Sequence, residues 1–226
     1  ETSKFEDEIY DPLEPFNRAI FSFNNAFDKS ISEPASKQYI KLPSPLQTGI
    51  RNFLSNLRMP LVFVNQLLQG QGKNASESAG RFLVNSTIGV FGLVDVADKI
   101  GLEEKEEDFG QTLATWGVGD GFYIVLPFFG PSNLRDSAGM VLTLTTDPIN
   151  AYAVSEGEAW LVPLRTSVNA VDQRSKIIDE VNALRNNSLD YYAAVRSSYY
   201  QNRKAAIANM NDNILTPLPL ISIEFE

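Results

Sequence analysis

The chain has 226 residues, 43% of them hydrophobic, and a formal net charge of −9. This length and apolar content are enough for one sizeable folded core, while the negative charge argues against a nucleic-acid partner. There is no histidine and no cysteine, which excludes imidazole bases, thiolate nucleophiles, disulfides and the common zinc and iron–sulfur sites.

The first predicted element is a helix that follows a polar N-terminal stretch. Residues 1–10 are interpreted as a tether. Between Pro12 and Asp28, apolar residues at alternating spacings of three and four predict one stripe along a helix, formed by Leu13, Phe16, Ile20, Phe23 and Phe27. Asn17 and Asn24 border this stripe. The pattern is typical of a core-facing helix; the alternative is a surface that contacts acyl chains.

Prolines mark the next predicted helices. Pro34 and Pro45 fit the first turns of two short helices. The second has an apolar face made of Leu46, Ile50, Phe53 and Leu57. After Pro60, residues 61–68 are apolar nearly all round, which predicts a separate helix buried in protein or in lipid.

Two polar pairs indicate further helix starts. Asn74 with Glu77 resembles a capping pair and predicts a helix with one shared face, formed by Ala79, Phe82, Leu83 and Ser86. Asp108 with Gln111 predicts a second start. Residues 89–95 between them are interpreted as a turn with apolar filling, and the acidic run 103–108 as a solvated loop.

A glycine-rich stretch and an aromatic turn come next. Residues 117–121 superficially resemble a nucleotide-binding loop, but the apolar segment after them is not a helix N-terminus able to hold phosphate, so that interpretation is rejected. Residues 126–132 form an aromatic turn that predicts Ser132 as an N-cap. Arg135 and Asp136 in the following turn are expected to form a structural ion pair.

Beyond Trp160 the helices become more polar. Two long helices are predicted, over about 163–184 and 188–210, followed by an extended stretch. The predicted organisation is a tether at 1–10, a helical domain at 11–160, a helical hairpin packed on it at 161–210 and an extended tail at 211–226.

Four groups of segments, in this order and spacing, resemble the MlaA/VacJ family. They are 11–18 with 23–24; 80–89 with 92 and 95–97; 108–113 with 116–119; and 126–127 with 130–132 and 135–136. The resemblance covers roughly residues 11–150, and the later residues carry no strong motif. It implies an all-α fold, in which a compact ring-like helical domain lies in one membrane leaflet and carries a C-terminal helical hairpin.

The resemblance also implies a function. Members are outer-membrane lipoproteins of the periplasmic leaflet, here anchored through a cysteine upstream of Glu1, and they associate with trimeric porins. They provide a passage that removes mislocalised phospholipid from the outer leaflet and hands it to a soluble periplasmic carrier, which maintains lipid asymmetry. The alternative is a structural envelope lipoprotein that acts as a scaffold without transporting lipid.

We expect no enzymatic activity, cofactor or metal, because histidine and cysteine are absent and neither Ser-x-x-Lys nor Gly-x-Ser-x-Gly occurs. A phospholipid-cleaving enzyme that uses carboxylates is the disfavoured third hypothesis. The candidates for the lipid path or its gate are Phe16, Asn17, Phe23, Asn24, Gly117, Gly119, Gly121, Phe128 and Phe129. The structural-motif candidates are Arg81, Asp95, Asp108, Gln111, Arg135 and Asp136.

Overall fold

The computed structural model describes residues 9–208, so most of the predicted tether and the whole predicted tail lie outside the described residues. The first half of the chain is helical. Its elements are α1 (Glu14–Phe27), the π-helical turn η1 (Asp28–Ser32), α2 (Glu33–Tyr39), α3 (Ser44–Leu68), α4 (Gly72–Thr87), α5 (Val96–Lys99) and α6 (Phe109–Thr115).

The second half begins with a short hairpin and returns to helices. Its elements are β1 (Tyr123–Leu126), β2 (Gly130–Asn133), α7 (Leu134–Thr146), α8 (Pro148–Ser155), α9 (Leu161–Lys176), α10 (Ile178–Asn187) and α11 (Tyr191–Ile207). The strands pair antiparallel, with Tyr123 opposite Asn133 and Leu126 opposite Gly130. The predicted all-α class is confirmed, with this hairpin as an addition that the sequence patterns did not indicate.

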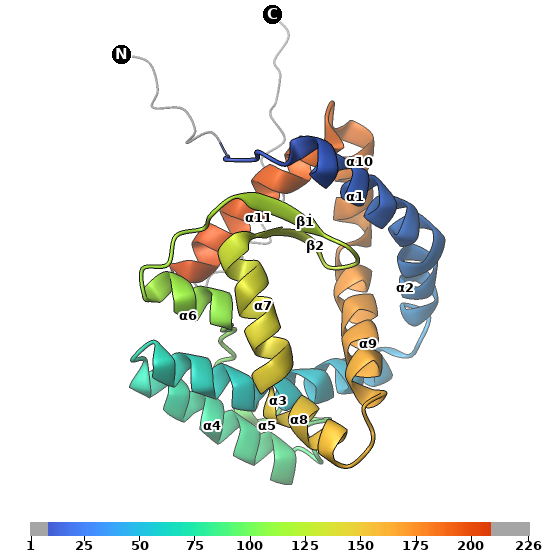
Figure 1. The fold of residues 1–226 in the computed structure, drawn as a ribbon. Coiled ribbons are helices and arrows are strands. Elements are labelled where there is room, and N and C mark those ends of the chain that lie inside the picture. The colour runs from blue at the N-terminus through green and yellow to red at the C-terminus, as the bar shows by residue number, and fades with distance from the viewer. Residues whose placement is uncertain (1–8, 209–226) are drawn as a thin grey trace, which may run out of the picture.

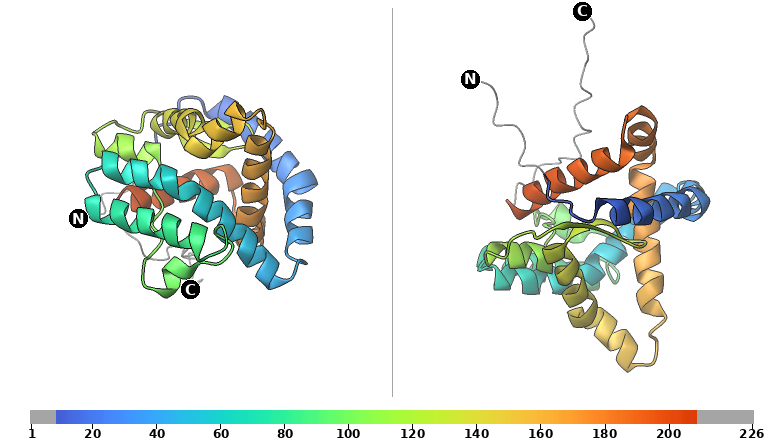
Figure 2. Two further views of the ribbon diagram at one scale, coloured as in Figure 1. Left: turned by 90° about the horizontal axis from the view of Figure 1, so that it is seen from below. Right: turned by 45° about the horizontal axis from the view of Figure 1, so that its top comes forward.

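The helices follow one another around a common centre (Figure 1). α3 packs along α4, α6 crosses α7, α9 packs on α2, and α11 contacts both α6 and β2. Figure 2 shows the same closed path from two other sides, with α8 and the start of α9 projecting from it as a corner. None of the helices within residues 9–208 has both the length and the apolar character needed to cross a bilayer.

Helix α3 is one continuous element, although two helices were predicted around Pro60. The expected break does not occur because Pro60 is accommodated within a 25-residue helix. Proline removes an intrahelical hydrogen bond and disturbs the preceding turn. Nearby, the Leu57 carbonyl accepts a hydrogen bond from Arg165 Nη2 (3.2 Å), so a distant helix stabilises the backbone close to this site.

Helix α4 begins earlier than predicted and buries a different face. It starts at Gly72, and Asn74 does not cap it. The Asn74 side chain instead accepts a hydrogen bond from Lys105 Nζ (2.9 Å). The buried face is mainly polar, formed by Ala75, Ser78, Arg81 and Asn85, whereas the predicted apolar face includes Leu83, which is 63% exposed. The other three residues of the predicted face, Ala79, Phe82 and Ser86, are half-buried.

Two other local predictions need correction. The N-cap of α7 is Asn133, whose side chain accepts from the Asp136 amide (2.7 Å), and Ser132 lies in β2. The acidic run is not wholly solvated, because Glu107 is 1% exposed and accepts from Gln69 Nε2 (2.8 Å). Burial raises the pKa of the Glu107 carboxyl.

The C-terminal helices are more broken than predicted, and they contact the rest of the fold at many points. The first predicted long helix divides into α9 and α10 at Ile177. α11 supplies Tyr192 to a small buried cluster with Tyr123 and Val125 of β1.

Asp108 caps α6 as predicted, by accepting from the Gln111 amide (2.9 Å).

Candidate functional site

Two asparagines attach α1 to the hairpin. Asn17 is fully buried; its Nδ2 donates to the Tyr123 carbonyl (3.1 Å), and its Oδ1 accepts from the Val125 amide (2.9 Å). Asn24, two helical turns later, repeats the pattern with the Leu126 carbonyl (2.9 Å) and the Phe128 amide (2.8 Å). A primary amide offers both a donor and an acceptor. The two side chains therefore continue the ladder of β1.

This geometry changes the role expected for the two amides. Both polar atoms of Asn17 and of Asn24 are engaged with backbone groups. Asn17 in particular has no solvent-exposed surface. Both residues therefore hold the hairpin to α1 through these contacts.

The aromatic residues of the same unit are exposed but in mutual contact. The ring of Phe128 packs edge-on against Phe23 (5.3 Å between centroids) and Phe27 (5.1 Å). Phe16, Phe23, Phe128 and Phe129 are all about half exposed or more. Phe128 has φ of +67°, a strained conformation for a residue with a side chain. The hairpin tip is therefore fixed to α1 through surface aromatic contacts.

The predicted glycine loop adjoins the hairpin. Gly117 and Gly121 have positive φ, and a Cβ on Gly121 would lie 2.8 Å from Leu134 Cβ. Gly119 has open space around it. The Asp120 carbonyl accepts from the Arg135 amide (3.2 Å), which fixes the loop to the start of α7.

Inside the ring, α11 meets α6 and α7 through ion pairs. Arg203 binds both oxygens of Asp108 (2.7 and 2.8 Å) and also contacts Asp136 (2.7 Å). Tyr199 donates to Asp136, and Arg135 pairs with Asp136 (3.0 Å) as predicted. Burial alone would raise the pKa of Asp108, but the hydrogen bonds and charge of Arg203 lower it to about 2. Hence Asp108 is ionised at neutral pH.

The remaining structural-motif residues hold neighbouring elements together. Arg81 is 1% exposed and pairs with Asp95 (2.7 Å). Gln111, in the amide orientation that satisfies its neighbours, donates to the Ala206 carbonyl (2.9 Å) and to Glu107 (3.0 Å).

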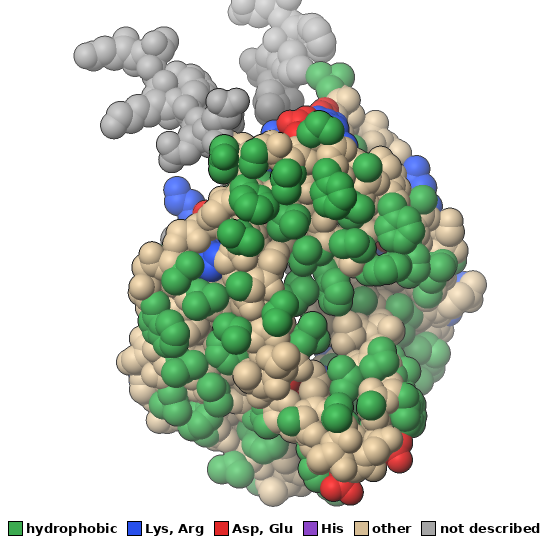
Figure 3. All heavy atoms as spheres, viewed as in Figure 1, with side chains coloured by type: hydrophobic (Ala, Val, Ile, Leu, Met, Phe, Trp, Pro, Cys, Tyr) green, Lys and Arg blue, Asp and Glu red, His purple; other side chains and the backbone are tan. Residues whose placement is uncertain are grey.

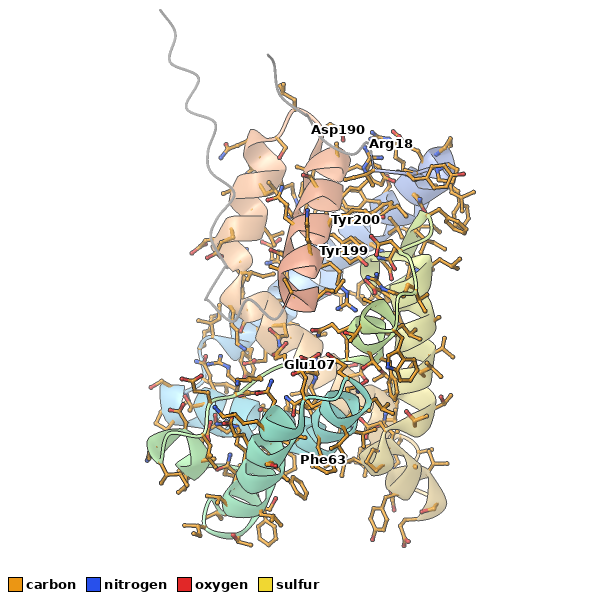
Figure 4. All side chains as sticks on the ribbon, turned by 90° about the vertical axis from the view of Figure 1, so that its left-hand side faces the viewer. Arg18, Phe63, Glu107, Asp190, Tyr199 and Tyr200 are labelled. Carbon is orange, nitrogen blue, oxygen red and sulfur yellow. The ribbon has the colours of Figure 1, made fainter. Side chains whose placement is uncertain are left out.

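The C-terminal helices supply a series of arginines that the sequence analysis missed. Each pairs with a carboxylate from another part of the ring. The pairs are Arg165–Asp147 (2.9 Å), Arg174–Asp28 (2.8 Å), Arg185–Asp28 (2.6 Å), Arg196–Asp11 (2.7 Å) and Arg203–Asp108 (2.7 Å). Their spacing of 7 to 11 residues is a signal in the sequence, but without coordinates it indicates only a solvated face. These contacts close the ring. Figure 4 shows Tyr199 and Tyr200 of α11, the helix that carries Arg203, projecting into the molecule.

The face seen in Figure 3 is hollowed between α7 and α9, and apolar side chains surround the hollow. A cleft of about 590 Å³ lies where α7, α8 and α9 meet. It is lined by Leu144, Thr145, Asn150, Ala151, Val154, Ser155, Ala159, Val162 and Pro163, none of them charged. None of the predicted lipid-path residues is among them. The signal that could have found this cleft is α8 itself, which is apolar nearly all round and has Ala153 as its buried residue.

Burial across the described residues is inverted relative to a water-soluble domain. Within residues 9–208, 16 polar or charged residues are buried against 11 hydrophobic ones, while 32 large hydrophobic residues are exposed. Soluble proteins bury most of their large apolar residues and rarely expose wide apolar patches. An apolar periphery around a polar, ion-paired interior is typical of a protein whose periphery faces hydrocarbon.

Comparison with known families agrees with this geometry. The family model described as MlaA lipoprotein matches residues 9–206. The chain belongs to the MlaA lipoprotein family. The match includes α9, α10 and most of α11, so it extends beyond residues 11–150, which carry the sequence motifs, to the C-terminal helices that carry the arginines.

Relatives and a solved structure support the assignment to the MlaA family. An uncharacterized protein of Rickettsia prowazekii is 35% identical over 94% of this chain and 83% of its own length. The intermembrane phospholipid transport system lipoprotein MlaA of Escherichia coli K12 is 35% identical over 88% and 78%. A chain solved in work on the structural basis for maintenance of bacterial outer membrane lipid asymmetry is 35% identical, with a TM-score of 0.77 over 87% of this chain and 98% of that one. The E. coli relative and one from Haemophilus influenzae are named as transport-system lipoproteins, and membership of this family confirms the prediction that the chain is not an enzyme.

Proposed function

We propose that this chain is the outer-membrane lipoprotein of an intermembrane phospholipid transport system and provides a passage that removes mislocalised phospholipid from the outer leaflet. The observation that carries the proposal is the inverted burial, with 32 large hydrophobic residues of the 9–208 segment exposed around an ion-paired interior. The E. coli and Haemophilus influenzae relatives, named as intermembrane phospholipid transport lipoproteins, support it.

The physical basis is the cost of moving a headgroup through hydrocarbon. A polar group transferred there without a hydrogen-bond partner costs several kcal/mol. A ring with polar groups inside lowers that cost, while apolar walls let acyl chains stay in contact with apolar surface. The charge-free cleft between α7, α8 and α9 is suited to acyl chains. No covalent step is required.

In this proposal, the exposed phenylalanines of α1 and the hairpin face acyl chains. Phe16, Phe23, Phe128 and Phe129 form the apolar rim. The exposed loop of Gly117, Gly119 and Gly121, held to α7 through Asp120, makes the tight turn that leads into the hairpin. The hairpin tip, held to α1 by Phe128, acts as the gate.

The finer points of location and partnership belong to the proposal as well. The chain lies in the periplasmic leaflet, is anchored through a lipidated cysteine upstream of Glu1, associates with a trimeric porin and hands phospholipid to a soluble periplasmic carrier. These points rest on the family resemblance. Energy for transfer comes from a partner in this proposal, because residues 1–226 contain no nucleotide-binding motif.

The test uses cells that lack the native protein and express variants of this chain. Val154 lines the cleft and is 56% exposed, so Val154→Asp puts a charge on an apolar wall with little effect on folding. We expect phospholipid to accumulate in the outer leaflet, measured by labelling of surface-exposed amino headgroups. The control is Leu189→Asp, at a fully exposed position between α10 and α11, which should resemble wild type.

Two results would contradict the proposal. The first is wild-type lipid asymmetry in the Val154→Asp strain at normal protein levels, combined with no phospholipid bound to the purified wild-type protein. A scaffold role would then be favoured. The second is release of lysophospholipid by the pure protein, which would require an enzyme.

A further inference from the structure

The loop between α4 and α5, residues 88–94, exposes more apolar surface than any core role explains. Its exposed side chains are Ile88 (70%), Val90 (55%), Phe91 (76%), Leu93 (46%) and Val94 (41%). It lies beside α3, because Asn52 Nδ2 donates to the Leu93 carbonyl (3.1 Å) (Figure 2). The twelve residues 83–94 include no charged side chain. Water is a poor solvent for such a surface.

The loop is nevertheless rigidly constructed. Val90 and Phe91 have φ of +55° and +58°, conformations that are costly for residues with side chains and especially for a β-branched one. Gly92, also at positive φ, packs against Asn56, where a Cβ would lie 2.6 Å from the Asn56 side chain. Strain of this kind persists only where the surroundings enforce it. Here it turns two bulky apolar side chains outward.

Most amide N–H groups of the loop are paired within the chain. Six of the seven amide N–H groups from 88 to 94 donate to carbonyls of residues 84–90. At the end of the loop, Asn85 Oδ1 accepts from the amides of Val96 and Ala97 (2.9 Å each), and Arg81 pairs with Asp95 (2.7 Å). A loop in water does not need its N–H groups paired internally, because water supplies hydrogen bonds. Hydrocarbon supplies none, so backbone groups at membrane depth must be paired internally.

We propose that the 88–94 loop is a preformed hydrophobic wedge that inserts into the acyl-chain region of the bilayer, as an attachment point separate from the α1–hairpin rim. This inference rests on the membrane location in the proposed function and adds which segment enters hydrocarbon. The strain at Val90 and Phe91 is the cost of presenting the wedge before membrane contact, which avoids ordering a flexible loop at that moment.

The test exploits the absence of cysteine from residues 1–226, which lets a single introduced thiol be labelled. The full chain carries a single environment-sensitive fluorophore at Phe91→Cys, Phe23→Cys or Leu189→Cys and is reconstituted in vesicles of phosphatidylethanolamine and phosphatidylglycerol. Quenching by acyl-chain nitroxide lipids is compared with quenching by aqueous iodide. We expect the Phe91 label to show blue-shifted emission, quenching by nitroxide and protection from iodide, whereas the Leu189 label behaves in the opposite way.

The Phe23 label separates failure of this inference from failure of the proposed function. If Phe23 is quenched by nitroxide lipids and Phe91 only by iodide, the wedge is overturned while the membrane location stands. If neither label is quenched by nitroxide lipids, both are overturned.

A second pair of variants avoids dependence on a label. Phe91→Ser should lower the vesicle partition coefficient by about tenfold or more, because one large apolar side chain is lost from hydrocarbon. Val90→Gly should keep or raise the thermal midpoint by relieving the positive φ, yet weaken partitioning. Unchanged partitioning in both variants would contradict the wedge.

Discussion

The junction of α11 with α6 and α7 and the contact of α1 with the hairpin hold the ring at two places by different means. At the first, Arg203 is bound between Asp108 and Asp136 within 3.0 Å. At the second, the ring of Phe128, itself 63% exposed, packs against Phe23 and Phe27. In a soluble domain these locations would be exchanged, with aromatics inside and ion pairs at the surface.

The difference shows what specifies the ring. Against hydrocarbon, exposed aromatics lose little by separating, because acyl chains solvate them as well as protein does. Polar pairs away from water have no such substitute, so they fix which helices meet. The interior contacts should therefore govern stability, and the rim contacts should govern the mobility of the hairpin.

The largest expected effect is at the ionic junction. Arg203→Ala leaves Asp108 and Asp136 without their cation, and we expect the free energy of unfolding to fall by about 3 kcal/mol, measured by thermal unfolding in detergent. The control is Arg18→Ala. Arg18 pairs with Asp190 at the exposed edge in Figure 4, so loss of this pair should lower the free energy of unfolding by at most about 1 kcal/mol. Equal effects of the two variants would contradict the comparison.

The pH dependence of the same junction has a definite sign. The pKa of Asp108 is lowered from 3.8 to about 2, so its contribution to stability is complete above 3.8 and is lost as the pH falls toward 2. The stability difference between wild type and Arg203→Ala should therefore persist at pH 5 and shrink below pH 4. A difference that disappears already at pH 5 would mean that the pKa of Asp108 is not lowered in the folded protein.

The next effect tests the packing that makes room for Arg203. A Cβ on Gly110 would lie 2.2 Å from Arg203 Nη2 and 2.6 Å from Asp136 Oδ1. Gly110→Ala should cost about 1–3 kcal/mol of unfolding free energy in chemical denaturation, through displacement of the guanidinium. Gly119→Ala, with nothing within 4 Å, is the matched control and should be neutral. A neutral Gly110→Ala would mean that the junction tolerates displacement.

A smaller effect is expected at the rim. Phe128→Ala removes two edge-on aromatic contacts, each worth about 0.5–1.5 kcal/mol. Because the residue is largely exposed, the global unfolding midpoint should change little, whereas amide exchange at the hairpin tip should accelerate. Phe129→Ala serves as the control for loss of an exposed ring at the adjacent position, and it should leave exchange nearly unchanged. Equal acceleration in both variants would sink the assigned contact.

The smallest effect concerns the buried Glu107. Its pKa is raised, so the folded state holds the proton more tightly than the unfolded chain, and the ionised form costs stability above the unfolded pKa of about 4.5. Glu107→Gln should therefore stabilise the protein at pH 7 by less than about 1 kcal/mol. The gain should vanish below pH 4 in thermal unfolding. Destabilisation at pH 7 would show that the hydrogen bond with Gln69 requires the carboxylate.

Local patterns predicted the helices that stand by themselves. The stripe between Pro12 and Asp28 gave a helix now seen at Glu14–Phe27, and the Asp108 cap lies where it was expected. The separate helix after Pro60 was wrong, because helix breaking is a local tendency that the rest of α3 overrides. The hairpin was missed because its two strands have only four residues each and depend on α1 for their second edge.

The candidate site was predictable in part for the same reason. Periodicity placed Phe16 and Phe23 on one face of a helix, but it gave no means of choosing between core and hydrocarbon. The role of Asn17 depends on Val125, 108 residues away, and that of Arg203 on Asp108, 95 residues away. No local pattern encodes such pairs.

By itself the sequence determined the chemical limits of this protein and most of its helices, because side-chain inventory and 3.6-residue periodicity are properties of short segments. It also carried the motifs that assign the family. Only the tertiary structure decided which face of each helix is buried, and that face is often the polar one. Burial depends on what surrounds an element, and here the arginines of α9 to α11 reach carboxylates around the ring while the apolar stripes are left outside.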